Sequence, residues 1–125
     1  MVNTVLIADD NTSIRQALCE LFQREADFEV CGEAENGHEA IEKARQLHPD
    51  LVVLDVSMPV MNGLDAARVL RDMMPTVPLI LYTAFKDYLM EEQVRLMGVS
   101  ELVSKSDPAS VLIAKARNLL CLVAA

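Results

Sequence analysis

Residue types that take part in phosphoryl transfer follow four short apolar runs of this sequence. The carboxylates Asp9 and Asp10 follow residues 4–8, Asp55 follows residues 51–54, Thr83 follows residues 77–82, and Lys105 follows residues 101–104. In a parallel sheet with right-handed crossovers, the carboxyl ends of all strands lie at one edge. Such a sheet would bring three carboxylates, a hydroxyl and an ammonium group into one crevice.

Carboxylates gathered in this way repel each other. Two unit charges about 4 Å apart repel by about 1 kcal/mol in water and by about 4 kcal/mol at an effective dielectric constant of about 20. A divalent cation relieves the repulsion, and an all-oxygen site favours Mg²⁺ or Mn²⁺. We therefore expect a Mg²⁺ site, with Mn²⁺ as the alternative ion, at Asp9, Asp10 and Asp55.

Each of these residues taken alone also has an ordinary structural explanation. An Asp-Asp pair after a strand is as often a helix cap with a solvated neighbour, and Asp55 alone is equally suited to capping its loop. A threonine at a strand end is common, and an isolated lysine is usually solvated. The occurrence of suitable residues at four strand ends together is what favours a site.

Hydrophobic periodicity predicts five strand–helix units and hence an α/β fold. Strands are expected at residues 4–8, 28–33, 51–54, 77–82 and 101–104, with 51–54 in the centre because it is the most apolar. The first helix is expected to follow a cap at Asn11 or Thr12 and to bury the stripe Ile14, Ala17, Leu18, Leu21 and Phe22. Further helices are expected from Asn36 to Pro49, at 64–73, at 87–97 before Gly98, and from Asp107-Pro108 to about residue 122.

Composition excludes several classes of function. The 125 residues fit one domain, and 19 acidic against 11 basic residues give a net charge of -8, which opposes binding to nucleic-acid phosphates. No signal peptide and no run of about 18 apolar residues is recognised, so we expect a cytoplasmic chain without membrane contact. Cys19, Cys31 and Cys121 lack C-x-x-C spacing, and we expect them to be buried reduced thiols.

The strand-end residues, taken with the loop after Asp55, match a known family. Besides the acidic pair, the matching motifs are Met58-Pro59, Met61-Asn62-Gly63, Thr83-Ala84 and Lys105. With these motifs the chain resembles, over essentially its whole length, the receiver domain of bacterial two-component response regulators. The resemblance implies a flavodoxin-like (βα)5 fold: a five-stranded parallel sheet in order 2-1-3-4-5, helices on both faces, and residues 1–125 forming a single receiver domain.

The resemblance also implies a phosphorylation-dependent signalling switch rather than an enzyme. Asp55 would accept a phosphoryl group from a sensor histidine kinase in a Mg²⁺-dependent reaction, since carboxylates form acyl phosphates. Slow autodephosphorylation would follow. Lys105 would neutralise the charge of the phosphoryl group, and Thr83 would donate a hydrogen bond to it.

A set of metal ligands follows from the same resemblance. Asp10 and Asp55 would bind Mg²⁺ directly, and Asp9 would act mainly through water. The backbone carbonyl of Ser57 would supply a further ligand.

In the resembled family, the fourth helix, fifth strand and fifth helix form the surface that changes on phosphorylation. Apolar side chains of residues 87–97 and of the last helix, such as Val111 and Ile113, are expected to be exposed there. They would bind a downstream partner, an output domain or a second copy of the chain as a homodimer. A last helix that is only broadly buried is an equally good interpretation.

Two residues near this surface need separate expectations. Three positions before the lysine the family usually carries Tyr or Phe, but this chain has Leu102, which is expected to weaken or reroute the switch. Phe85, two positions after the threonine, is expected either to restrict the water that hydrolyses the acyl phosphate or to pack under its loop.

Three other functions fit parts of the pattern. A receiver-like adaptor would dock partners through residues 88–97 independently of phosphorylation. A flavodoxin-like mononucleotide binder would need a hydroxyl- or glycine-rich loop after the first strand, where Asp9 and Asp10 would repel phosphate. A phosphohydrolase with an aspartyl nucleophile usually has a second Asp near the end of the first strand, separated from the nucleophile by an intervening residue that this chain lacks.

Overall fold

The computed structural model describes residues 2–124, and the chain alternates between strands and helices over this range. The strands are β1 (Asn3–Ala8), β2 (Phe28–Ala34), β3 (Leu51–Asp55), β4 (Leu79–Thr83) and β5 (Glu101–Ser104). The helices are α1 (Thr12–Gln23), α2 (Gly37–Leu47), α3 (Gly63–Met73), α4 (Tyr88–Leu96) and α5 (Ala109–Ala124). All five predicted strand–helix units are therefore present.

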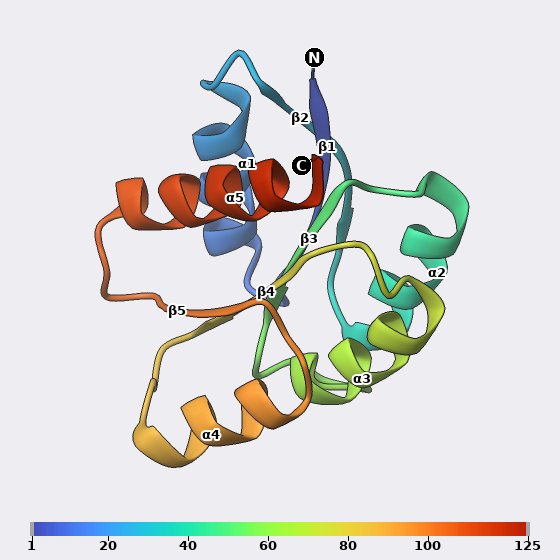
Figure 1. Ribbon diagram of the computed structural model, residues 1–125, viewed down its shortest axis with the longest axis vertical. Coiled ribbons are helices and arrows are strands. Elements are labelled where there is room, and N and C mark those ends of the chain that lie inside the picture. Colours follow the sequence, from blue (N-terminus) through green and yellow to red (C-terminus); the bar gives the residue numbers. More distant parts are fainter. Residues whose placement is uncertain (1, 125) are drawn as a thin grey trace.

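The strands form one parallel sheet in the order β2-β1-β3-β4-β5, with β3 in the centre (Figure 1). This order confirms the flavodoxin-like arrangement. The register aligns the strand ends, because Ala8 pairs with Leu54, Asp55 with Tyr82, and Thr83 with Ser104. The segments that follow β1, β3, β4 and β5 consequently leave the sheet at nearly the same level.

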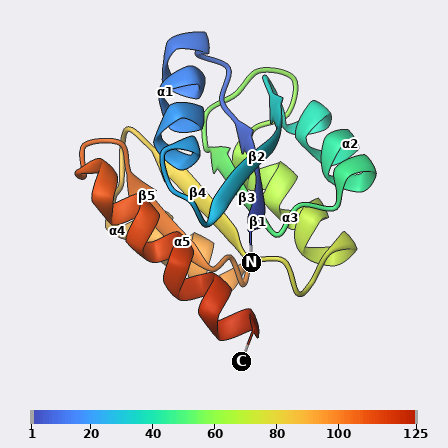
Figure 2. The ribbon, with the colours of Figure 1, turned by 90° about the horizontal axis from the view of Figure 1, so that it is seen from above.

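Helices cover both faces of this sheet. α1 and α5 lie on one face, and α2, α3 and α4 lie on the other (Figure 1, Figure 2). Alternate residues of β1 follow this division: Val5 and Ile7 pack with the first layer, whereas Leu6 and Ala8 pack with the second. Because both faces are covered, all four side chains are buried, which accounts for the continuous apolar run in the sequence.

Four helices begin with the same type of side-chain cap. The cap side chain accepts a hydrogen bond from the backbone N–H three residues later, and the caps are Asn11, Asn36, Asn62 and Asp87. Three of these helices follow strands whose ends carry predicted site residues. The caps therefore fix where those loops turn into helix.

Helix α1 buries most of the predicted stripe: Leu18 and Phe22 are buried, and Ile14 and Leu21 are partly buried against the same cluster. Its buried residues are Arg15, Leu18, Cys19 and Phe22. Ala17, which was predicted to be buried, is exposed. The spacing of both sets is helical, and the observed set includes an arginine because its guanidinium finds a backbone carbonyl at the end of β1.

Several element boundaries differ from the prediction by one or two residues, and those at the starts of β4 and α5 involve proline. β4 begins at Leu79 rather than at residue 77, since Pro78 has no N–H to give to the ladder; its carbonyl accepts a hydrogen bond from Val52. α5 begins at Ala109, so Pro108 precedes the helix instead of occupying its first turn. Neither difference moves a strand end that carries a predicted site residue.

The cysteines follow the prediction only in part. Cys19 is buried and Cys31 is half-buried, but Cys121 is exposed on α5, so its predicted burial was wrong. Among the helices of residues 2–124, none combines the length and the apolar character that a membrane crossing requires.

Candidate functional site

Three carboxylates meet at the carboxyl edge of the two central strands. Asp9 directly follows β1 and is fully buried, Asp55 ends β3 and is 5% exposed, and Asp10 is exposed. One carboxylate oxygen from each residue lies within 4.8 Å of the others. The structure therefore brings together the acidic cluster predicted from the strand ends.

Lys105 lies between the two buried carboxylates. Its Nζ atom is 3.1 Å from Oδ1 of Asp55 and 3.2 Å from Oδ2 of Asp9. Its backbone N–H donates to the carbonyl of Thr83 at 2.6 Å, which extends the pairing of β4 with β5 by one residue. The end of β5 thus places the ammonium group beside carboxylates at the ends of β1 and β3.

Sequence reasoning missed one neighbour of this lysine. The ring of Tyr82 on β4 lies with its centroid 5.5 Å from Nζ of Lys105, a cation–π geometry. Tyr82 packs against the cluster of apolar residues under α1 and α5. The available signal was an aromatic residue directly before Thr83, at a strand end that the topology places beside β5.

The charges of the site shift the pKa values of its members. Burial, followed by the neighbouring charge of Asp9, raises the pKa of Asp55 to about 6, although Lys105 opposes the shift. Burial alone would lower the pKa of Lys105, but hydrogen bonding to Asp55 and the charges of both carboxylates outweigh it, so the pKa is raised. With three carboxylates and one ammonium, the ionised site carries an excess of negative charge that a cation would neutralise.

Two glycines hold the loop after Asp55 against the sheet. A Cβ atom at Gly63 would collide with the backbone carbonyl of Asp55, and the Gly63 N–H donates to Val56 at 2.9 Å. Gly37 at the start of α2 donates to the carbonyl of Met61 at 2.8 Å, and a Cβ there would also clash with that carbonyl. Side chains at these positions would push the loop away from the aspartate.

The same loop contains a strained residue. Val60 has a φ of 67°, a left-handed conformation that β-branched residues seldom adopt, and it is 84% exposed. The Met61 N–H donates to the carbonyl of Pro59 at 2.7 Å across Val60. This tight turn in the loop after Asp55 was not predicted from the Pro59 and Asn62-Gly63 signals, which indicated only a loop.

Thr83 and Ser57, the other predicted site residues, lie at the strand ends expected for them. Thr83 is 5% exposed, and its hydroxyl accepts a hydrogen bond from the N–H of Phe85 at 3.1 Å. The Ser57 N–H lies 3.4 Å from Oδ1 of Asp55. A hydrogen bond from Thr83 to a phosphoryl oxygen and a metal contact of the Ser57 carbonyl stay predictions.

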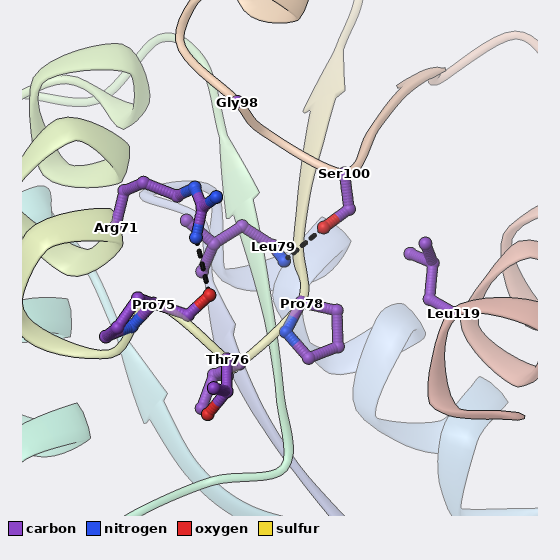
Figure 3. A pocket seen from close by; sticks show the side chains of 9 residues that line it. Arg71, Pro75, Thr76, Pro78, Leu79, Gly98, Ser100 and Leu119 are labelled. Carbon is purple, nitrogen blue, oxygen red and sulfur yellow. Dashed lines mark hydrogen bonds between the residues drawn. The ribbon is translucent and has the colours of Figure 1, made fainter. Parts of the chain in front are cut away.

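A pocket at the opposite end of the sheet carries different chemistry. It encloses about 190 Å³ at the amino ends of β4 and β5. Arg71 donates to the carbonyl of Pro75 there, and the Leu79 N–H donates to Oγ of Ser100 (Figure 3). The Arg71 guanidinium and the Ser100 hydroxyl thus each contact backbone of the pocket wall, and the acidic cluster lies at the other edge of the sheet.

Apolar side chains are exposed on α4 and on the loop before it. Phe85, Tyr88, Leu89 and Leu96 are each more than 70% exposed. Phe85 therefore does not pack under its loop, and the alternative that it does was wrong. On α5, Ile113 is buried and Val111 is half-buried, so the predicted exposure of Ile113 was wrong and the alternative of a buried last helix holds at this residue. The exposed apolar surface consequently belongs to α4 and not to this part of α5.

Leu102, at the position where the resembled family usually carries an aromatic residue, is buried. It is 6% exposed on β5 and packs with the cluster that includes Val94 and Val99. This side chain lies inside the contact between the sheet and the α4 layer.

Residues 5–117 match the response regulator receiver domain family. The chain is 33% identical over 109 residues to the transcriptional regulatory protein LnrK of Bacillus subtilis strain 168, covering 87% of this chain and 50% of LnrK. It is 36% identical over 105 residues to the chemotaxis protein CheY of Thermotoga maritima, covering 84% of this chain and 87% of CheY. The chain thus spans about half the length of LnrK and most of the length of CheY.

A solved structure shows the same arrangement. The crystal structure of the response regulator domain of Thermotoga maritima CheB has a TM-score of 0.89 and 26% identity, covering 96% of this chain and 97% of that chain. The matched residues 5–117 include the acidic cluster and Lys105. The chain therefore belongs to the response regulator receiver domain family, as a signalling domain whose acidic pocket is consistent with the family's phosphoacceptor role.

Proposed function

We propose that Asp55 accepts a phosphoryl group from a phosphohistidine of a sensor histidine kinase. The observation that carries the proposal is the position of its carboxylate, which ends the central strand in contact with Lys105 and beside Asp9 and Asp10. Asp55 is nearly buried, so a phosphorylated form would be shielded from bulk water. Residues 1–125 would act as a single receiver domain.

In the proposed reaction a carboxylate oxygen of Asp55 attacks phosphorus as the bond to the histidine nitrogen breaks. The electron pair stays on the imidazole, which takes a proton from solvent. Lys105, which contacts both Asp9 and Asp55, would exchange its contact with Asp9 for one to a phosphoryl oxygen. Thr83 would exchange its contact with the Phe85 N–H for a hydrogen bond to a second phosphoryl oxygen.

The chemistry of the acidic cluster fits Mg²⁺. Its three residues offer only oxygen atoms, and these atoms lie within 4.8 Å of one another. Asp10 and Asp55 would hold the ion directly, Asp9 through water, and the Ser57 carbonyl would add a ligand. When bound, the ion would neutralise charge on the transferring group; Mn²⁺ has the same oxygen preference.

The signalling output is assigned to α4, β5 and α5. The exposed side chains of Phe85, Tyr88, Leu89 and Leu96 supply an apolar surface that a downstream partner, an output domain or a second copy of the chain would cover. A cytoplasmic location and slow autodephosphorylation belong to the same proposal and rest on the family alone.

Labelling with a small phosphodonor tests the acceptor. The parent chain incubated with acetyl phosphate and Mg²⁺ should gain one phosphoryl group by intact mass, and Asp55→Asn should gain none. Asp72→Asn removes an exposed carboxylate of α3 and should label like the parent. Equal labelling of Asp55→Asn would refute the assignment. A change in sedimentation with phosphodonor would separate the switch from an adaptor that docks regardless of phosphorylation.

A further inference from the structure

An arginine occupies the buried face of α1 beside the acidic cluster. Arg15 is 8% exposed, and its guanidinium has partners on three residues. Nη1 donates to the backbone carbonyl of Asp9 at 2.8 Å, Nε donates to Oε1 of Glu33 at 3.0 Å, and Nη2 lies 3.6 Å from Oε1 of Glu35. Each nitrogen of this buried guanidinium therefore has an oxygen partner that compensates its burial.

The contact with Asp9 bears directly on the metal-binding residues. The carbonyl that Arg15 holds belongs to the planar peptide joining Asp9 to Asp10, so its orientation fixes where the Asp10 backbone begins. The N–H of Asp9 donates to the carbonyl of Ala34 at 3.0 Å. The peptide units on both sides of Asp9 are thus held, one by β2 and the other by Arg15.

The charge of Arg15 is neutralised away from the cluster. Glu33 and Glu35 lie at and just beyond the end of β2, and their side chains are about half exposed or more, at 47% and 64%. Arg15 therefore reaches the β1–α1 loop as a hydrogen-bond donor to a carbonyl and not as a counter-ion of the three aspartates. Arg15 therefore affects the aspartates by holding their backbone in place and not by neutralising their charge.

A second arginine of the chain makes side-chain contacts of the same kind without touching the site. Arg117 on α5 pairs with Asp27 at 2.9 Å and with Glu25 at 3.1 Å, both in the loop between α1 and β2. Removing either guanidinium breaks contacts to two carboxylates. Only Arg15 also holds the backbone next to Asp10, which makes Arg117 the matched control.

We propose that Arg15 is a positioning residue for the divalent cation, holding the Asp9–Asp10 peptide so that both carboxylates face Asp55. The inference rests on the proposed Mg²⁺ site. Groups that orient metal ligands typically contribute 10- to 100-fold to metal affinity. Arg15→Met keeps the length of the side chain and removes every donor, so it should weaken Mg²⁺ binding by about tenfold or more.

Calorimetric titration of the parent, Arg15→Met and Arg117→Met with MgCl₂ measures this effect. Arg117→Met should bind Mg²⁺ within about twofold of the parent. In Mg²⁺-free protein, the amide resonances of Asp10 and Asn11 should shift in Arg15→Met and stay in place in Arg117→Met. Equal Mg²⁺ affinity in the parent and Arg15→Met, or equal losses in the two variants, would overturn the role of Arg15.

Two milder variants decide the matter if Arg15→Met does not fold. Arg15→Lys keeps the charge but not the guanidinium fork, and it should lose Mg²⁺ affinity several-fold. Glu33→Gln leaves the contact between Arg15 and Asp9 in place and should bind like the parent. The reverse order of these two variants contradicts the inference. A parent that does not bind Mg²⁺ contradicts the proposed metal site itself, which is a separate result.

Discussion

At the scale of single residues, the fold holds two carboxylates buried and close together, which is electrostatically unfavourable. Asp55 is nearly buried beside the carboxylate of Asp9, and one ammonium group serves both. The pKa of Asp55 is therefore raised to about 6, chiefly by burial and then by Asp9. Without metal, the folded protein therefore carries an unfavourable free energy from the ionised Asp55 near neutral pH. This free energy is available to favour the binding of a cation or the transfer of a phosphoryl group.

The raised pKa of Asp55 predicts a pH-dependent stability. Because this carboxyl binds its proton more tightly in the folded chain, its stabilising contribution is complete below about pH 4 and is lost as pH rises through about 6. The loss amounts to about 3 kcal/mol at most, at about 1.4 kcal/mol per pKa unit. Without Mg²⁺, Asp55→Asn should therefore gain stability relative to the parent between pH 4 and pH 7.

Urea unfolding of both proteins in EDTA across this pH range gives the comparison. Saturating Mg²⁺ favours the ionised carboxylate, so it should reduce or reverse the trend. A difference between the two proteins that does not change with pH in EDTA would contradict the raised pKa.

The members of the site differ in how far the sequence predicts them. Asp9, Asp55 and Lys105 were predictable because parallel topology brings strand ends together whatever the details of packing. Tyr82 and Arg15 were not, because their contacts depend on which face of an element is buried. The available signal for Arg15 was its spacing, because it precedes Leu18, Cys19 and Phe22 by three, four and seven positions and so lies on their face of the helix. A search for periodic apolar residues alone does not detect an arginine on that face.

At the scale of elements, the connection from β4 to α4 is the part of the site best placed to move. Thr83 ends β4, its hydroxyl holds the N–H of Phe85, and the segment then continues into the exposed helix α4. Phosphorylation shifts a population only by the difference in interaction energy between two arrangements. A phosphoryl oxygen that competes for the Thr83 hydroxyl supplies such a difference.

We expect Thr83→Ala to keep phosphorylation of Asp55 largely intact and to abolish the phosphorylation-induced change in residues 85–97. Leu102→Ala should instead lower the free energy of unfolding by about 2–4 kcal/mol, since Leu102 is buried against the α4 layer. Hydrogen exchange of residues 85–97, with and without phosphodonor, measures the first effect and urea unfolding the second. If Thr83→Ala retains the parent's full exchange change, the signal travels by another route.

The elements themselves were largely predictable, and the exceptions have local causes. Continuous apolar runs predicted the strands because helices cover both faces of the sheet. The start of β4 was placed two residues too early because the apolar run was followed through Pro78, whose missing N–H cannot contribute to the ladder. The sequence left the burial of Ile113 open because α5 is apolar around much of its circumference, so its pattern does not indicate which face packs.

At the scale of the whole molecule, the acidic site adds to an already negative chain. The net charge is -8, and three of the acidic residues are gathered at one edge of the sheet. The two apolar clusters on either side of the sheet share its strands, so a ligand at the ends of β1 and β3 stabilises both. Binding only to the folded chain adds about 2.7 kcal/mol at a ligand concentration of about 100 times Kd.

Asp10→Asn should accordingly have opposite effects with and without metal. In EDTA it should raise the melting temperature by a few degrees, because it removes one of three mutually repelling carboxylates, and Asp10 is exposed enough for its amide to stay solvated. In saturating Mg²⁺ it should gain much less than the parent, because a direct ligand is lost. Asp72→Asn makes the same change in net charge at an exposed position of α3, so it separates local repulsion from total charge. If Mg²⁺ raises the melting temperatures of Asp10→Asn and the parent equally, Asp10 is not a ligand; if Asp72→Asn matches Asp10→Asn in EDTA, the relief comes from total charge and not from the cluster.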